Sequence, residues 1–302
     1  MRPAGIEMNL SFNRSLDAPF GVEVRLSPLV SRVLAPNPGP FTFKGTGVYV
    51  VGAGQSVAVI DPGPALPGHI ENLKRILAAR RASHILVTHT HRDHSPAAAA
   101  LKSWSGAKTY GVPLASRTAP PASGEGKVDE AHDHDFVPTV TVRDGMRIQG
   151  EGFTLECVAT PGHTANHICY ALPQESALFS GDHVMGWSTS VIAPPDGDMG
   201  QYLASLEKLK ARGDHILYPT HGSPIAKPQE WLGQLIAHRH GREEQILAAL
   251  KTGPLSIFEL VEKLYSTLDP VLRPAAAQQV AAHLAHLKAR GKVMPVDGRW
   301  RV

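Results

Sequence analysis

Short apolar runs, bounded by glycine, proline and polar residues, alternate with amphipathic stretches over most of the chain. Between about residues 55 and 112, this pattern predicts the order strand–helix–strand–helix–strand. The first of these helices places Ile70, Leu73, Ile76 and Leu77 on one face, and the second is the alanine-rich run after His94. Another helix is predicted at 199–213, and further strands at 22–26, 46–54, 139–142, 153–160, 167–173, 176–182 and 215–221.

The pattern changes near residue 228. Three helices are predicted after it, at 231–253, 255–266 and 273–291. Two short strands then flank Asp297-Gly298, a dipeptide that favours a tight hairpin turn. Three helices followed by a hairpin indicate a winged helix, so we expect a catalytic domain over 1–227 and a winged-helix domain over 228–302.

The stretch 113–138 separates two regions of regular pattern and is rich in proline, glycine, serine and charged residues. A stretch of this length without a periodic pattern predicts either a functional loop or a disordered one. It contains a second His/Asp cluster at 131–136. We interpret this cluster as an exposed polar loop, and a loop at the substrate entrance is the alternative.

Composition narrows the classes of function. A chain of 302 residues can bury a large core and can hold more than one domain. A net charge of +3 argues against a nucleic-acid coat or a membrane-surface protein. No run approaches the ~20 apolar residues that span a bilayer. The N-terminal segment has no signal-peptide block, so we expect a cytoplasmic protein with no membrane partner. Cys157 and Cys169 are expected as buried free thiols.

The strongest candidate for chemistry is THTHRDH, at residues 88–94. His89, His91, Asp93 and His94 fall within six positions, directly after a predicted buried strand. Imidazole and carboxylate groups bind zinc and similar divalent ions, and a strand end fixes the position of its loop. One zinc ion needs about four ligands. His89 with His91, and Asp93 with His94, therefore form two incomplete sets.

The missing ligands follow other predicted strands. We expect two ions with Asp182 bridging them, the first bound by His89, His91 and His163, and the second by Asp93, His94 and His221. Two divalent ions ~3.5–4 Å apart share a hydroxide that is a nucleophile at neutral pH. We expect Zn²⁺, with Mn²⁺ or Fe²⁺ as alternatives, and Asp93 or a metal-bound water as the group that protonates the leaving group.

The order of the motifs THTHRDH, TPGHT, SGD and PTHG makes residues 20–225 resemble the metallo-β-lactamase superfamily. The resemblance implies an αββα sandwich, in which two sheets pack face to face with helices outside and metals at one edge. It also implies that Asp61, in the motif IDPG, orients a ligand histidine. Residues 185–209, HRHGREEQIL and the winged helix together resemble the lactamase-β-like 2 group. Asn166 and Thr220 stand where that group often has Asp and Gly.

The resemblance implies a metal-dependent hydrolase and leaves its substrate open. Mitochondrial members of that group are endoribonucleases on single-stranded RNA, which favours a phosphodiesterase. The alternative is a thioester or lactone hydrolase similar to hydroxyacylglutathione hydrolase, acting on a small ester. The presence of Asp93 and the absence of an export signal argue against an antibiotic-destroying β-lactamase. A third hypothesis, a winged-helix regulator that senses metal without turnover, is disfavoured by the complete ligand set.

The remaining candidates concern the C-terminal third. Residues 236–302 contain ten Lys and Arg against six Asp and Glu, a mild excess. We therefore expect the winged helix to pack on the catalytic domain or to form a homodimer. The alternative is a single-stranded nucleic acid held by Trp300 and its flanking arginines. Ser188 and Thr189 are candidates for lining the substrate site, whereas His238 and His240 are expected at the surface.

Overall fold

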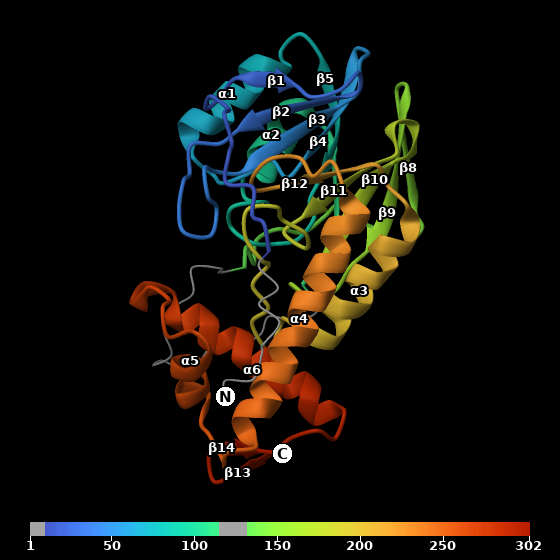
Figure 1. Ribbon diagram of the computed structural model, residues 1–302. Helices are drawn as coiled ribbons and strands as arrows, with labels where there is room; N and C mark the ends of the chain where they lie inside the picture. Colours follow the sequence, from blue (N-terminus) through green and yellow to red (C-terminus); the bar gives the residue numbers. More distant parts are fainter. Residues whose placement is uncertain (1–9, 115–131) are drawn as a thin grey trace.

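Two β-sheets form the larger part of the molecule in the computed structural model, which describes residues 10–114 and 132–302 (Figure 1). The first sheet has seven strands in chain order: β1 (Glu23–Arg25), β2 (Val30–Leu34), β3 (Gly47–Val51), β4 (Ser56–Ile60), β5 (Arg81–Leu86), β6 (Lys108–Gly111) and β7 (Val140–Thr141). The second has the order β12 (Ile216–Pro219), β11 (Ala177–Gly181), β10 (Ile168–Leu172), β9 (Phe153–Ala159) and β8 (Arg147–Gly150).

The two sheets pack face to face because successive side chains of a strand point to opposite faces. In β3, Tyr49 and Val51 join the hydrophobic cluster between the sheets, whereas Val48 and Val50 join the cluster on the outer face. The same alternation in β10 places Ile168, Tyr170 and Leu172 inside. Both cysteines are buried free thiols, as expected.

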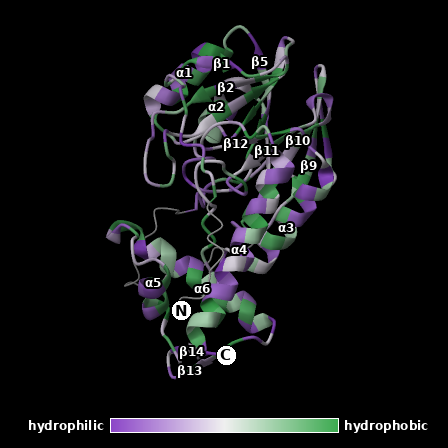
Figure 2. Ribbon diagram, in the orientation of Figure 1, coloured by the Kyte–Doolittle hydropathy of each residue, from purple (hydrophilic) through white to green (hydrophobic). Residues whose placement is uncertain are grey.

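Helices cover the outer face of each sheet. Helices α1 (Pro67–Leu77) and α2 (Ala97–Ser105) pack on the first sheet through Leu73, Leu77 and Leu101. Helices α3 (Met199–Arg212) and α4 (Pro228–Leu250) pack on the second through Leu206 and Leu232. Figure 2 shows apolar strands and, along α3 and α4, alternating apolar and polar residues. The αββα sandwich is confirmed.

Two strands were not predicted. Strand β2 is buried along its whole length, but Arg32 in its centre interrupts the apolar pattern. Arg32 is tolerated there because its guanidinium donates to the carbonyl oxygen of Gly222, at 3.0 Å. Strand β8 is a four-residue strand with alternate exposure. Most of the predicted loop at 113–138 lies outside the described residues.

The C-terminal part is a winged helix. It contains the end of α4, α5 (Ile257–Leu264), the 3₁₀ turn η2 (Pro270–Leu272), α6 (Arg273–Ala289), and the hairpin β13 (Met294–Val296) and β14 (Arg299–Arg301). A capping box at Ser256 and Glu259 begins α5. Asp297 and Gly298 both have positive φ, at 48° and 75°, as the predicted hairpin turn requires.

Helix α4 belongs to both hydrophobic cores. Leu232 and Leu235 pack in the cluster on the second sheet, whereas Ile246 and Leu250 pack in the winged-helix cluster. Figure 1 shows this helix running from the sheets into the C-terminal part. The predicted domain boundary at 227/228 stays a prediction. Within the ranges that the structure covers, the helices are all too short or too polar to span a bilayer.

Candidate metal centre

Strand ends from both sheets meet at one edge of the sandwich. Strands β4 and β5 are parallel, so Asp61 and His89 follow carboxyl ends that lie side by side. Strands β11 and β12 are also parallel and are followed by Asp182 and His221. The loops after these strands are joined across the sheets, because the Thr220 hydroxyl of one sheet donates to Asp61 of the other.

One group of three histidines lies at this edge. The donor atoms of His89, His91 and His163 lie within 4.8 Å of one another. His89 Nε2 and His91 Nδ1 are 2.8 Å apart. His163 Nδ1–H donates to the carbonyl oxygen of Val191 at 2.6 Å. That hydrogen bond leaves the lone pair of His163 Nε2 for a ligand.

A second group contains Asp93, His94 and His221. His221 Nε2 is 3.0 Å from Asp93 Oδ2, and His94 Nε2 is 3.5 Å from the same oxygen. His221 Nδ1–H donates to the carbonyl oxygen of Gly45, at 3.1 Å. Asp182 Oδ2 lies 3.4 Å from His221 Nε2 and 3.6 Å from His94 Nε2, and Asp182 also groups with His89. All seven predicted ligands are therefore together, with Asp182 adjoining both groups.

Asp61 is fully buried behind the second group and accepts four hydrogen bonds. Its oxygens accept from the amide and the hydroxyl of Thr88 and from the hydroxyl of Thr220, each at 2.8 Å. His94 Nδ1–H donates to it at 2.9 Å. The structure thus places Asp61 where the family resemblance implied, and Thr220, which replaces a frequent glycine, adds one of its hydrogen bonds.

The two groups differ in their affinity for protons. Burial lowers the pKa of His89, His91 and His163, so these imidazoles are neutral, which is the form that binds metal. Burial also lowers the pKa of His221, but the carboxylates of Asp182 and Asp93 outweigh it and raise that pKa to about 10. Without a metal, the second group therefore holds protons.

The side chains fit divalent ions. Two buried atoms that face the site, His163 Nε2 and Asp182 Oδ1, have no hydrogen-bond partner among residues 10–114 and 132–302. Leaving such atoms unpaired costs free energy. Imidazole nitrogens and carboxylate oxygens are zinc ligands, so bound ions would satisfy these atoms.

Close approaches explain two glycines of the ligand loops. A Cβ on Gly162, directly before His163, would lie 2.3 Å from the Cα of Tyr202 in α3. A Cβ on Gly181, before Asp182, would lie 2.5 Å from His167 Nε2. Both glycines also have positive φ. The loops that carry His163 and Asp182 therefore reach the site only because the preceding glycines have no side chain.

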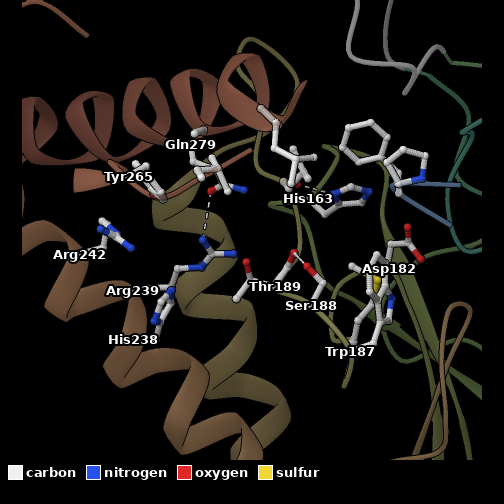
Figure 3. Close-up of a pocket in the computed structure, with 18 of the residues that line it drawn as sticks. His163, Asp182, Trp187, Ser188, Thr189, His238, Arg239, Arg242, Tyr265 and Gln279 are labelled. Atoms are coloured by element: carbon white, nitrogen blue, oxygen red, sulfur yellow. Dashed lines mark hydrogen bonds between the residues drawn. The ribbon is translucent and has the colours of Figure 1, made fainter. Parts of the chain in front are cut away.

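A pocket with a volume of about 280 Å³ begins at the metal centre (Figure 3). His163 and Asp182 line one end of it, and Ser188 and Thr189 line its wall as predicted. The pocket continues between Trp187 of the catalytic part and apolar residues of the C-terminal part, namely Leu268, Leu272, Ala275 and Ala276. The winged helix thus supplies one wall of a pocket that opens onto the metal centre.

Other residues at the site were not found from the sequence. His238 lines the pocket and is half-buried, so the expectation of a surface position was wrong for it, whereas His240 is exposed. In the second His/Asp cluster, His134 is exposed as expected. His132 instead packs 4.9 Å from the ring of His91 and pairs with Asp196 at 3.2 Å.

His167 and His183 are buried behind the ligands, and His167 packs 5.1 Å from the His89 ring. His167 comes three residues after the motif TPGHT and His183 directly after SGD, so a signal in the sequence was present. The substituted Asn166 donates to Thr90 and to the carbonyl oxygen of Val112, both at 3.0 Å. Asn166 therefore braces the loop that carries His91.

Comparison with known proteins shows the family of the chain. Residues 42–221 match the family model of the metallo-beta-lactamase superfamily, and residues 256–300 match the beta-lactamase associated winged helix domain. The chain is 34% identical to the atrochrysone carboxyl ACP thioesterase AgnL7 of Paecilomyces divaricatus, over 84% of this chain and 77% of that protein. It is 33% identical to the beta-lactamase-like protein 2 homolog of Caenorhabditis elegans, over 89% and 87%.

A solved structure has the same fold over nearly the whole chain. The beta-lactamase domain protein from Burkholderia ambifaria superimposes with a TM-score of 0.80 at 21% identity and covers 96% of both chains. The chain therefore belongs to the metallo-β-lactamase superfamily and carries the winged-helix domain associated with it.

Proposed function

We propose that this protein is a metal-dependent hydrolase of acyl thioesters. The observation that carries the proposal is the pocket that begins at His163 and Asp182 and continues along apolar side chains of the C-terminal part. A thioester carbonyl at the metal centre would place its acyl chain in this pocket. Apolar walls suit an acyl chain because they remove its methylene groups from water.

The seven clustered side chains would hold two divalent ions, with zinc the expected metal. Bound there, the ions would supply an activated water and would polarise the carbonyl. The water oxygen bonds to the acyl carbon, the carbon–sulfur bond breaks, and the sulfur leaves with the electron pair. The proton from water ends on that sulfur. Asp93, with a side chain 27% exposed and 3.0 Å from His221, is placed to carry this proton.

The leaving group also favours a thioester. A thiol has a pKa of about 8.5, so a thiolate leaves with little help from a proton donor. A ribose oxygen leaves as an alkoxide and needs a well-placed acid. The sequence offers no separate candidate for that acid beyond Asp93 or a metal-bound water.

The wing of the C-terminal part leaves Arg299 and Arg301 exposed, but it offers little aromatic surface for stacking on a base. Trp300 is partly buried and packs against the winged-helix core, and Arg299 pairs with Glu259 at 3.2 Å. Helix α6 packs in this core through Val280 and Leu284, and its Ala282 joins the core on the second sheet. These contacts support a packing role for the winged helix.

The name of one relative also supports thioester hydrolysis. That relative, AgnL7, is named an atrochrysone carboxyl ACP thioesterase.

Phosphodiester hydrolysis is the second candidate. The observation that favours it is the presence of Arg14, Arg239 and Arg242 along the pocket, since arginine also binds phosphate. Single-stranded RNA as a partner, a homodimer and a cytoplasmic location also stay predictions.

The test is a substrate comparison on purified protein with measured metal content. Acyl thioesters of N-acetylcysteamine, single-stranded RNA and a bis-aryl phosphate are assayed side by side. We expect thiol release to exceed the other two activities, and Asp93→Ala to lower it by about 10–100-fold or more, because it removes a predicted metal ligand. His134→Ala, which removes an exposed histidine, is the control and should retain activity. Cleavage of RNA without thiol release would favour the second candidate, and full activity of Asp93→Ala would contradict the mechanism.

A further inference from the structure

The end of the pocket away from the metals is positively charged. Arg239 and Arg242 lie three residues apart on α4, a spacing that puts both on one helix face, and both line the pocket (Figure 3). Within the described part of the chain, neither of them has a carboxylate within ion-pair distance, although nine pairs of Lys or Arg with a carboxylate occur among these residues. The positive charges of Arg239 and Arg242 are therefore not neutralised by carboxylates of the described residues.

Arg239 is the deeper of the two, with 3% of its surface exposed. Its guanidinium donates to the carbonyl oxygen of Ser190 at 2.6 Å and to Gln279 Oε1 at 3.1 Å, and both acceptors are neutral. Its Nε has no hydrogen-bond partner among the residues described. A buried guanidinium without an anion is costly, and an anionic ligand would offset that cost.

Arg242 lies nearer to the solvent and is stacked on an aromatic ring. Its guanidinium carbon is 4.3 Å from the ring centroid of Tyr265, which fixes the plane of the group. It donates to Gln245 Oε1 at 2.7 Å, again a neutral acceptor. A guanidinium held in a fixed plane is preorganised for the two oxygens of a carboxylate.

We propose that this end of the pocket binds a carboxylate carried by the acyl chain itself. The inference rests on the proposed thioesterase function and narrows its substrate class to thioesters of dicarboxylic acids. The scissile carbonyl lies at the metal centre, and the remote carboxylate lies at Arg242, with the charge of Arg239 behind it. Leu268, Leu272 and Ala276 also line this pocket, so methylene groups fit there better than ribose hydroxyls.

The experiment compares matched thioesters of N-acetylcysteamine on the metal-loaded protein. Each dicarboxylic monothioester, from succinyl to suberyl, is paired with the neutral acyl thioester of equal chain length. We expect kcat/KM to be about tenfold or more higher for the carboxylated member at the best length, because a charged hydrogen bond is worth that much. Arg242→Gln should reduce this ratio to near one.

The control is Arg143→Gln, which removes one positive charge from an exposed residue that does not line the pocket. It should keep the ratio of the unmodified protein, and Arg242→Lys should keep part of it. If Arg242→Gln does not fold, the proposal is tested by the ratio of kcat/KM values for the carboxylated and neutral thioesters in the unmodified protein. A ratio of one or less at every chain length would overturn the inference while leaving the thioesterase function intact.

Failure of the proposed function is distinguishable from failure of the inference. If no thioester is hydrolysed, the same compounds are stable ligands, and their dissociation constants are measured by calorimetry. Tighter binding of the carboxylated members by about tenfold, lost in Arg242→Gln, would still support the anion site. Equal binding within each pair would overturn it.

Discussion

Asp61 determines which nitrogen of His94 carries a proton. Because the carboxylate accepts from His94 Nδ1–H, the lone pair of His94 Nε2 is available to a ligand. Asp61 itself has positive φ, at 49°, a conformation that aspartate and asparagine tolerate better than most residues. An asparagine at this position can therefore keep the backbone while changing only the hydrogen bonds.

We expect Asp61→Asn to weaken binding of the second ion by about 10–100-fold. The new amide group donates where the carboxylate accepted, so it favours the His94 tautomer with its proton on Nε2, which cannot bind metal. Chelator competition measures the dissociation constants. Thr220→Val, which removes one of the four hydrogen bonds, is the milder comparison and should cost less. Unchanged affinity in Asp61→Asn would show that Asp61 does not orient His94.

At the scale of elements, the position of His163 depends on how closely its loop approaches α3. The loop passes so near the helix that a Cβ added to Gly162 would lie 2.3 Å from the Cα of Tyr202. The φ of Gly162 is +139°, outside the range that other residues favour. The contact between a helix and a loop thus sets the geometry of a candidate ligand.

We expect Gly162→Ala to lower the free energy of unfolding by roughly 3 kcal/mol or more, through backbone strain and overpacking together. Gly152 also has positive φ, at 75°, but nothing lies within 4 Å of its added Cβ. Gly152→Ala should therefore cost only about 1–2 kcal/mol. Urea unfolding compares the two variants, and metal content reports on His163. Equal costs would mean that the loop moves away from α3 without penalty.

At the scale of the whole molecule, buried histidines make the stability of the metal-free protein depend on pH in two directions. Burial lowers the pKa of several of them, His89 and His167 among them, so the unfolded chain binds more protons at acid pH. The pKa of His94 and of His221 is raised instead, the latter to about 10, despite burial, by the carboxylates beside them. Above pH 6.5, the folded chain therefore holds protons that the unfolded chain has released.

Because some histidine pKa values are lowered and others raised, we expect the metal-free protein, kept so by a chelator, to be most stable near pH 6.5. Below that pH, stability falls as the histidines with lowered pKa become protonated on unfolding. Above it, the contribution of His94 and His221 is lost as the pH rises towards the His221 pKa of about 10. Urea unfolding across this range checks the curve. With metal bound, the decline between pH 6.5 and 9 should disappear, and stability rising through pH 8 in chelator would contradict the assignment.

The ligand motif and the presence of most strands were predicted from the sequence because both are local patterns. THTHRDH follows one buried strand, whereas β3 and β10 are apolar throughout, so only the packing of the sheets separates their inner from their outer residues. The strand-end position of His163, Asp182 and His221 was also predictable. Their convergence at one edge required β9, β11 and β12 to run in the same direction, and the packing of the two sheets brought that edge to the THTHRDH loop.

Tertiary structure alone decided the pocket and its charge. Arg239 stands between His238 and His240, which were expected at the surface, yet it is buried because α6 and the loop at Ser190 pack over it. His132 lies beside His91, 41 positions away, through contacts that no local pattern encodes. Sequence periodicity reports which face of an element is buried. It does not report which distant element covers that face, and here that element supplies the wall of the site.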